Sequence, residues 1–274
     1  MTSPDAYYSH SGKFNPAGLL LMLAAGLVVG PLVGVVYGYA VAFNPFIYIN
    51  FLATIIAGGA VGMAVGKMAK PGRVRSVGAC AFAGLVAGVG FQYTQWWATL
   101  DYYGAEVALT QPGAIWTFIG ELAELEPWTL MGVSLGSTGF MILWAIEGLI
   151  VVGAPMAVAM AEGSTPYCER CDTWAVEGEP LGPFDFVSDA DTLKARIDRR
   201  DHDGLKAFER PEVTEDRYST VTLAACTGCR GLLLATVKNV EVEVEKDGDT
   251  KRNETEILTH VMLDSPTYDA LAKL

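Results

Sequence analysis

Hydrophobic and charged positions are distributed very unevenly along this chain. No charged side chain occurs over residues 14–66 or 76–100, and Glu147 is the only one within residues 127–161. The hydrocarbon core of a bilayer, about 30 Å thick, takes roughly 20 apolar residues per helix. The first stretch is therefore long enough for two membrane spans, and each of the other two stretches for one span.

The first stretch must contain a turn, and Asn44-Pro45 lies near its middle. Proline lacks a backbone N–H and restricts the residue before it, so this pair is expected to end a helix. The pattern predicts four transmembrane helices, at about 17–42, 47–67, 77–99 and 134–160. A cleaved signal peptide ending at Ala40-Val41-Ala42 is the alternative for the first helix, although its apolar run is longer than a typical signal.

The basic residues predict the orientation of these spans. The short connection between the second and third spans carries Lys67, Lys70, Arg73 and Arg75, whereas residues 76–169 contain no Lys or Arg. Positively charged loops stay in the cytoplasm. We therefore expect both termini to be cytoplasmic, with an N-terminal tail at 1–16, a transmembrane domain at 17–161 and a cytosolic domain at 162–274.

The outer connection between the third and fourth spans has a helical pattern of its own. Ile115, Ile119 and Leu122 recur at helical spacing after Pro112, with acidic residues on another side. This pattern predicts a helix over about 112–126, lying at the outer interface among aromatic residues. It either seals the end of the bundle or forms a lid over an outward cavity.

Glycines recur every four residues in the predicted spans. Such rows lie on nearly one face of a helix and let another backbone approach closely. The first span carries Gly26, Gly30, Gly34 and Gly38, and the second carries Gly58, Gly62 and Gly66. The rows resemble the glycine zippers of tightly packed and often oligomeric membrane helices. They predict either close packing of the first span on the second within one chain, or a homo-oligomer.

Glu147 is the one carboxyl group inside a predicted span, and apart from Lys67 at the very end of the second span no span contains a Lys, Arg or His to pair with it. A carboxylate in the membrane is costly and tends to face the interior of a bundle or water. Asn50, Gln92, Gln95 or a tyrosine are its candidate hydrogen-bond partners. Two interpretations remain open: a structural hydrogen bond made by a neutral acid, or a role in handling protons or ions.

Two Cys-x-x-Cys pairs follow the last span. They are Cys168 with Cys171 and Cys226 with Cys229, separated by a long insert. Each pair can present two thiolates to one ion, and two pairs complete a tetrahedral shell. The pattern resembles a zinc ribbon, although about 15–20 residues between pairs is more usual. We expect a structural zinc ion; rubredoxin-like iron and a redox dithiol are the alternatives.

The rest of the C-terminal domain has an α+β pattern. A charged helix is predicted from Ser188 or Asp189 to about Phe208, followed by a strand over 219–225. A hairpin is predicted over 232–245 and 252–263, with a turn at Asp247-Gly248. A short last helix is expected to begin with Ser265 as its N-cap. The predicted fold class is thus a glycine-rich α-helical membrane bundle with a small cytosolic α+β domain.

Charge narrows the functional classes. From Glu162 onward there are 24 acidic and 14 basic residues, a net charge of −10. Nucleic-acid binding needs a basic face, so we do not expect it. No phosphate-binding glycine loop, His-Glu-x-x-His motif or nucleophile elbow occurs in the sequence, so we do not expect an enzyme.

The order of the elements, four glycine-rich spans followed directly by a four-cysteine domain, resembles uncharacterised bacterial membrane proteins with a C-terminal zinc ribbon. This resemblance implies a multi-pass protein of the bacterial inner membrane and no particular activity. Our first hypothesis is a scaffold or adaptor in the lipid bilayer whose zinc domain binds a cytosolic or membrane protein. The alternative is a glycine-zipper oligomer that acts as a channel or transporter, with Glu147 in its pathway.

Overall fold

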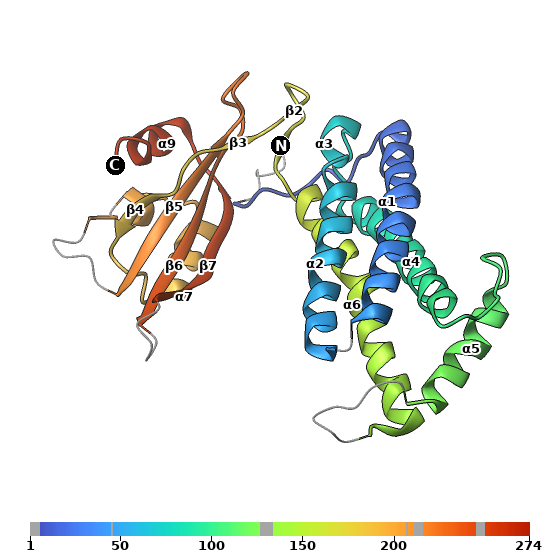
Figure 1. Cartoon of the computed structure of the whole chain (residues 1–274). Coiled ribbons are helices and arrows are strands. Elements are labelled where there is room, and N and C mark those ends of the chain that lie inside the picture. The colour runs from blue at the N-terminus through green and yellow to red at the C-terminus, as the bar shows by residue number, and fades with distance from the viewer. Residues whose placement is uncertain (1–5, 45, 127–133, 207, 211–215, 245–249) are drawn as a thin grey trace. The chain divides into compact units, whose positions relative to one another are not determined.

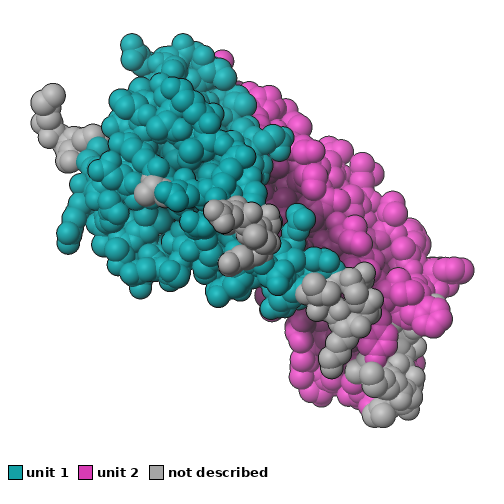
Figure 2. Space-filling model, turned by 90° about the vertical axis from the view of Figure 1, so that its left-hand side faces the viewer, with its two compact units in different colours: residues 1–10, 165–274 teal, residues 11–164 magenta. Residues whose placement is uncertain are grey.

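The computed structural model describes the chain except for residues 1–5, 45, 127–133, 207, 211–215 and 245–249 (Figure 1). It divides into two compact units, which Figure 2 colours separately. The first unit along the helical part of the chain is Ser11–Ser164 (magenta, unit 2 in Figure 2), and the second unit combines Met1–His10 with Thr165–Leu274 (teal, unit 1 in Figure 2). The beginning of the predicted N-terminal tail therefore belongs to the same unit as the C-terminal domain.

The first unit contains four helices that are long and apolar enough to cross a membrane. They are α1 (Pro16–Phe43), α2 (Ile47–Gly66), α4 (Val77–Tyr102) and α6 (Gly136–Gly163). The short helix α3 (Ala69–Gly72) lies between α2 and α4. Each long helix matches one of the spans predicted from the sequence within a few residues.

The surface of this unit is apolar. Among the described residues, every large hydrophobic side chain that is exposed lies within residues 14–149, except for Val176 and Leu274 in the other unit. Leu20, Val36 and Leu149 are each at least two-thirds exposed on the long helices. An exposed apolar belt of this extent is unfavourable in water and suits a bilayer.

Within the bundle, α1 packs mainly along α4, whereas α2 and α4 both pack along α6. The glycine rows lie at these contacts. The structure corrects the expected pairing of the first row, because Gly26, Gly30, Gly34 and Gly38 face α4 and not α2. The second row faces α6, and Gly84 and Gly88 of α4 face α6 as well.

Helix α5 (Pro112–Glu124) lies in the connection between α4 and α6. Its residues Ile115, Ile119 and Leu122 are buried in one apolar cluster with Trp96 of α4 and Trp144 of α6. This apolar face covers side chains of the bundle, which favours a sealing helix over a lid. Its position at a membrane interface stays a prediction.

The second unit is built on an antiparallel sheet in the order β3-β5-β6-β7, with β4 also paired to β5. A separate two-stranded hairpin, β1 with β2, precedes it. The strands are β1 (Tyr167–Cys168), β2 (Thr173–Trp174), β3 (Val176–Glu177), β4 (Leu181–Phe184), β5 (Arg217–Ala225), β6 (Leu233–Val244) and β7 (Thr250–Met262). Strands β5, β6 and β7 confirm the predicted strand and hairpin, whose expected turn at 247–248 lies outside the described residues.

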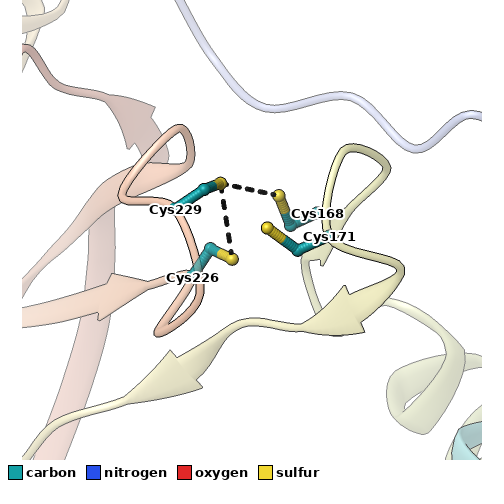
Figure 3. A group of neighbouring side chains, drawn as sticks. All are labelled: Cys168, Cys171, Cys226 and Cys229. Carbon is teal, nitrogen blue, oxygen red and sulfur yellow. Dashed lines mark hydrogen bonds between the residues drawn. The ribbon is translucent and has the colours of Figure 1, made fainter.

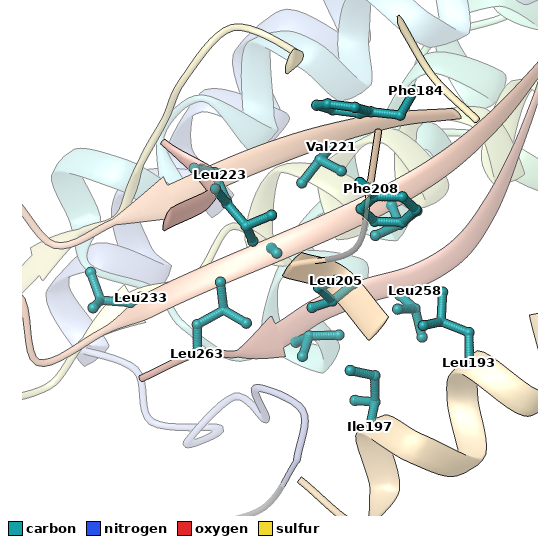
Figure 4. Packing of buried hydrophobic residues seen from close by; sticks show 14 residues of the cluster. Phe184, Leu193, Ile197, Leu205, Phe208, Val221, Leu223, Leu233, Leu258 and Leu263 are labelled. Carbon is teal, nitrogen blue, oxygen red and sulfur yellow. The ribbon is translucent and has the colours of Figure 1, made fainter. Parts of the chain in front are cut away.

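Helices α7 (Ala190–Asp198), α8 (Asp203–Lys206) and α9 (Ser265–Leu271) complete this unit. Its core contains Phe184, Ile197 and Leu258, which are almost fully buried (Figure 4). The single helix predicted from 189 to about 208 was wrong, since α7 ends at Asp198 and α8 follows separately. Asp189 does cap α7, accepting a hydrogen bond from the Thr192 N–H at 2.9 Å.

The N-cap predicted for the last helix was also wrong. Asp264, and not Ser265, accepts the hydrogen bond from the Thr267 N–H, at 2.8 Å. An aspartate at this position also places a negative charge at the positive end of the helix, which stabilises it. Consistent with this arrangement, the hydrogen bonds from Thr267 lower the pKa of the Asp264 carboxyl.

Candidate metal centre

The four cysteines lie on two similar turns. Cys168 ends β1 and Cys171 lies in the turn to β2, while Cys226 and Cys229 lie in the turn between β5 and β6. In both turns the residue directly after the second cysteine has a positive φ, 55° at Asp172 and 51° at Arg230. This left-handed residue turns the chain away, so that both sulfurs of each pair point to one side.

The two turns bring all four sulfurs together, as Figure 3 shows. All four Sγ atoms lie within 4.8 Å of one another. The Sγ of Cys229 is 3.6 Å from that of Cys168 and 3.8 Å from that of Cys226. A tetrahedral ion with bonds of about 2.3 Å to sulfur requires sulfur–sulfur distances of about 3.8 Å. The cluster could therefore hold one metal ion.

The pKa values of Cys168, Cys171 and Cys226 are not shifted in the same direction. Burial opposes charge on Cys226, but the backbone N–H groups of Cys229 and Gly228 stabilise its thiolate and lower its pKa to about 6. Proton sharing with Cys229, followed by burial, raises the pKa of Cys171 to about 12. Burial is the main cause that raises the pKa of Cys168. A cation is what would allow the remaining thiols to ionise beside the first thiolate.

Small residues leave room for the sulfurs. A Cβ atom at Gly228 would lie 3.2 Å from the Sγ of Cys171, and one at Gly231 would lie 3.2 Å from the Sγ of Cys229. Both distances are tighter than ordinary van der Waals contact. These two glycines therefore allow the second turn to approach the cluster closely.

The N-terminal segment, residues 6–8, forms hydrogen bonds that hold the turn between β1 and β2 in place. Tyr7 forms a β-bridge with Val261 of β7, and the Tyr8 N–H donates to the carbonyl oxygen of His260 at 2.9 Å. The Tyr8 hydroxyl accepts a hydrogen bond from the Tyr167 N–H at 3.0 Å and lies 3.3 Å from the Tyr167 carbonyl oxygen. Tyr167 precedes Cys168, so residues distant in the sequence fix the backbone of a metal-ligand candidate.

The polar candidates in the predicted spans form a second cluster. The Oε1 of Glu147 accepts hydrogen bonds from the Tyr37 hydroxyl at 2.8 Å and from the Gln95 Nε2 at 3.1 Å. Asn50 does not bond to Glu147; its Oδ1 accepts from the Asn44 Nδ2 at 2.7 Å. Of the candidate partners, the structure thus brings a tyrosine and Gln95 to the carboxyl.

The other amide candidate, Gln92, lies near Gly148, the residue after Glu147. A Cβ atom at Gly148 would be 3.3 Å from the Gln92 Nε2. The Oε1 of Gln92 is buried without a hydrogen-bond partner among the described residues. Gln92 therefore packs beside the backbone of α6 and makes no hydrogen bond to the carboxyl.

The glycines provide close backbone contact and no ligand atoms. A Cβ atom at Gly30 would lie 2.3 Å from the Ala87 carbonyl oxygen, and one at Gly62 would lie 2.7 Å from the Pro155 Cα. Real Cβ atoms do not approach backbone so closely, so the rows are needed for packing within this chain. This finding supports the intramolecular interpretation and does not test the oligomeric one.

Comparison of the chain with known protein families, with curated proteins and with solved structures finds no significant match. The four-cysteine cluster and the cluster around Glu147 are therefore the features that indicate function.

Sequence reasoning did not single out Tyr37, Thr54 and Tyr8. Tyr37 is one of three tyrosines in the charge-free run 14–66, with Tyr39 and Tyr48, which was a usable signal because a buried hydroxyl needs a partner. Thr54 is buried within hydrogen-bond reach of the Tyr37 hydroxyl. Tyr8 had no such signal, because its contacts depend on a segment that is 159 residues away in the sequence.

Proposed function

We propose that this protein is a membrane-anchored adaptor whose cytosolic domain is shaped by a structural zinc ion. The observation that carries the proposal is the convergence of four thiols, each within 4.8 Å of the others, at one point between two chain turns. Four thiolates fill a tetrahedral shell and leave no open position for a substrate, which favours a structural ion over a catalytic one.

Zinc is the preferred metal for this site. Four-thiolate shells bind zinc or iron, and the sulfur–sulfur distances of 3.6 and 3.8 Å suit a tetrahedral ion of either kind. Zinc has no redox chemistry and forms structural sites of this composition in small domains. Iron is the alternative, and elemental analysis distinguishes the two.

The pairing of the two ends supports the predicted topology. Residues 6–8 are hydrogen-bonded to β7, so the segment before α1 and the domain after α6 must lie on the same side of a membrane. An even number of spans satisfies this requirement. The basic connection between α2 and α4 favours the cytoplasm for that side. Reduced thiols persist there, as a thiolate site requires.

Charge suggests the chemistry of the partner. The domain is acidic, with a net charge of −10 from Glu162 onward. An acidic surface attracts a basic one electrostatically, so we propose a protein partner with a positively charged face. The same charge disfavours nucleic acid as a partner.

The first test is the metal itself. The full-length protein purified in mild detergent should contain about one zinc per chain, and the double variant Cys168→Ser with Cys226→Ser should contain none. The control is Cys80→Ser, since Cys80 lies buried in the membrane unit and should not affect the metal content. Iron in place of zinc would change the metal assignment. A protein without metal, or a double variant that still contains metal, would contradict the assignment of these cysteines as a metal site.

The second test addresses the adaptor role and the topology. A stoichiometric protein should co-purify with the wild-type chain and be lost, together with zinc, from the double cysteine variant. Cysteines introduced near Gly72, at the exposed Lys70, should be shielded from an impermeant reagent outside the cell, and cysteines near Gly113 should be labelled. Ion flux through liposomes containing only this protein would instead favour a channel or transporter.

A further inference from the structure

A chain of polar side chains leads into the bundle from the connection between α1 and α2. The Asn44 Nδ2 donates to the Asn50 Oδ1 at 2.7 Å, and the Thr54 hydroxyl donates to the Asn50 carbonyl oxygen at 2.8 Å. Thr54 also shares a hydrogen bond with the Tyr37 hydroxyl, which lies 2.8 Å from the Oε1 of Glu147. The hydrogen-bonded chain thus runs from the helix ends to a single carboxyl group.

This row of hydrogen-bonded side chains ends beside a small pocket. The cavity has a volume of about 50 Å³, and its lining includes Asn50, Phe51, Thr54, Trp144, Ile146 and Glu147. That volume is sufficient for a water molecule or an ion. Phe51 and Ile146 are each 48% exposed, so the pocket lies at the side of the bundle.

The carboxyl has one oxygen free to face this pocket. Its Oε1 accepts both hydrogen bonds, from Tyr37 and from Gln95, whereas its Oε2 has no partner among the described residues. Glu147 is half-buried and lines the cavity. Leaving an ionised carboxylate in this environment without a counter-charge is costly.

The polar chain does not continue across the bundle. The remaining parts of the four long helices, residues 16–36, 55–66, 77–91 and 148–161, contain no charged, amide, hydroxyl or imidazole side chain. Gly30 of α1 and Gly62 of α2, which lie in these parts, are in close contact with neighbouring backbone. Glu147 therefore lies at the inner end of a row of hydrogen-bonded polar side chains that begins at one end of the bundle. This arrangement fits a binding site better than a pore through a single polypeptide.

We propose that the pocket at Glu147 binds one monovalent cation, a proton or a sodium ion. Three of the residues that line the pocket carry side-chain oxygen atoms that can serve as ligands: Glu147, Thr54 and Asn50. Such oxygens suit a hard cation. One positive charge neutralises the single carboxylate, whereas a divalent ion would leave a net charge inside the membrane.

The neighbouring side chains are compatible with both occupied forms. Tyr37 is the only titratable side chain that faces Glu147 among the described residues; α2 contributes Thr54 and α4 contributes Gln95. The Oε1 of Gln95 is buried without a hydrogen-bond partner in the described part of the chain. If the Gln95 amide rotated by half a turn, this oxygen would accept the proton of a neutral Glu147.

Labelling with N,N′-dicyclohexylcarbodiimide tests this site in the full-length protein in liposomes. The reagent is apolar and adds to a protonated carboxyl, whose proton moves to a carbodiimide nitrogen as the new C–O bond forms. Peptide mass spectrometry should find the adduct on Glu147. Its yield is measured from mildly acidic to mildly alkaline pH, with sodium chloride or choline chloride at equal ionic strength.

If the ligand is a proton, labelling should fall with rising pH, by about tenfold per pH unit once the acid is ionised, and sodium should have no effect. If the ligand is sodium, sodium chloride should slow labelling severalfold relative to choline chloride. Thr54→Val should then reduce this protection, because it removes an oxygen and keeps the shape. No adduct on Glu147 in the folded protein, or labelling that responds to neither pH nor sodium, would overturn the proposal.

Two variants serve as controls. Glu147→Gln should lose the adduct, and Glu162→Gln, at the far end of α6, should keep it. The double variant Cys168→Ser with Cys226→Ser should be labelled like the wild type, because the proposal does not depend on the zinc site. Labelling is therefore informative even if the adaptor function is wrong.

Discussion

The two units of this protein are stabilised in different ways. In the first unit, which contains the four long apolar helices, the closest contacts join backbones: a Cβ atom at Gly30 would be 2.3 Å from the Ala87 carbonyl oxygen. In the second unit the core consists of large side chains such as Phe184, Ile197 and Leu258. Large apolar side chains of the membrane unit, Leu20 and Leu149 among them, remain on its surface.

This difference is expected if the helices of the first unit lie in lipid and the second unit lies in water. Lipid tails solvate leucine as well as a protein core does, so burying apolar area drives little association of helices, and close van der Waals contact between backbones replaces it. In water, burial of apolar area is the main driving force. The second unit has one core of modest size, and the region around the cysteines has only a small apolar cluster of its own. A bound metal ion would add the stabilisation that this small apolar cluster does not provide.

The largest effect should come from removing the metal ligands. Cys168→Ser with Cys226→Ser should unfold the region around β1, β2 and the β5–β6 turn, because binding and folding of such sites are coupled at about 10–16 kcal/mol. Helices α1, α2, α4 and α6 should keep their structure. Hydrogen exchange measured by mass spectrometry on both units would show this. Equal loss of protection in both units would contradict the independence of the two.

The metal site should also respond to acid. Metal binding requires thiolates, and protons compete for them, so occupancy should fall as the pH is lowered. In the metal-free protein Cys226, with a pKa of about 6, should be the first thiol to ionise as the pH rises. The thiolate absorbance of the metal-free protein near neutral pH should therefore be lost in Cys226→Ser and kept in Cys171→Ser, since the pKa of Cys171 is about 12. The opposite result would contradict the assigned hydrogen bonds.

A smaller effect is expected from adding one methyl group between α1 and α4. Gly30→Ala should destabilise the membrane unit by about 1–3 kcal/mol, since the backbones must separate to admit it. The matched control is Gly59→Ala on α2, where a Cβ atom meets nothing within 4 Å. Thermal unfolding in mild detergent, followed by circular dichroism, compares the two. Similar stability for both variants would mean that α1 and α4 are not packed through this row.

Removing one hydroxyl tests the brace formed by the N-terminal segment. Tyr8→Phe leaves the Tyr167 N–H without its partner, which should cost the second unit about 1–2 kcal/mol. Tyr218→Phe is the control, because its hydroxyl makes no hydrogen bond within the described residues. Amide exchange at Tyr167 and Cys168 should increase only in Tyr8→Phe. Unchanged exchange there would show that the segment does not stabilise the first turn.

The smallest effect should be that of Glu147→Gln on stability. Glutamine retains an acceptor for Tyr37 and Gln95, so the unfolding free energy should change by less than about 1 kcal/mol. Glu147→Leu removes the acceptor of the Gln95 amide and one of the partners of the Tyr37 hydroxyl, which keeps its hydrogen bond with Thr54, and should cost about 1–2 kcal/mol. Thermal unfolding in detergent measures both. A large loss of stability in Glu147→Gln would mean that the charge itself holds the helices together.

The sequence by itself determined the number and approximate bounds of the long helices, the strands β5 to β7 and the four cysteines as a set. These features depend on local pattern: a run of apolar residues, alternation along a strand, and a Cys-x-x-Cys spacing. The break between α7 and α8 was missed because both segments continue the same charged composition across Arg199 and Arg200. Arg200 has a φ of 61°, which no helix accommodates.

Only the tertiary structure decided which helices are neighbours. A glycine row indicates that another backbone packs closely against the helix, but it does not indicate which one. In the structure α4, and not α2, packs against Gly30. The same holds for Tyr37 and Gln95, which reach Glu147 from two different helices, and for Tyr8, which reaches the turn at Cys168. Such contacts are set by the crossing of whole elements, and a local sequence pattern contains no information about that crossing.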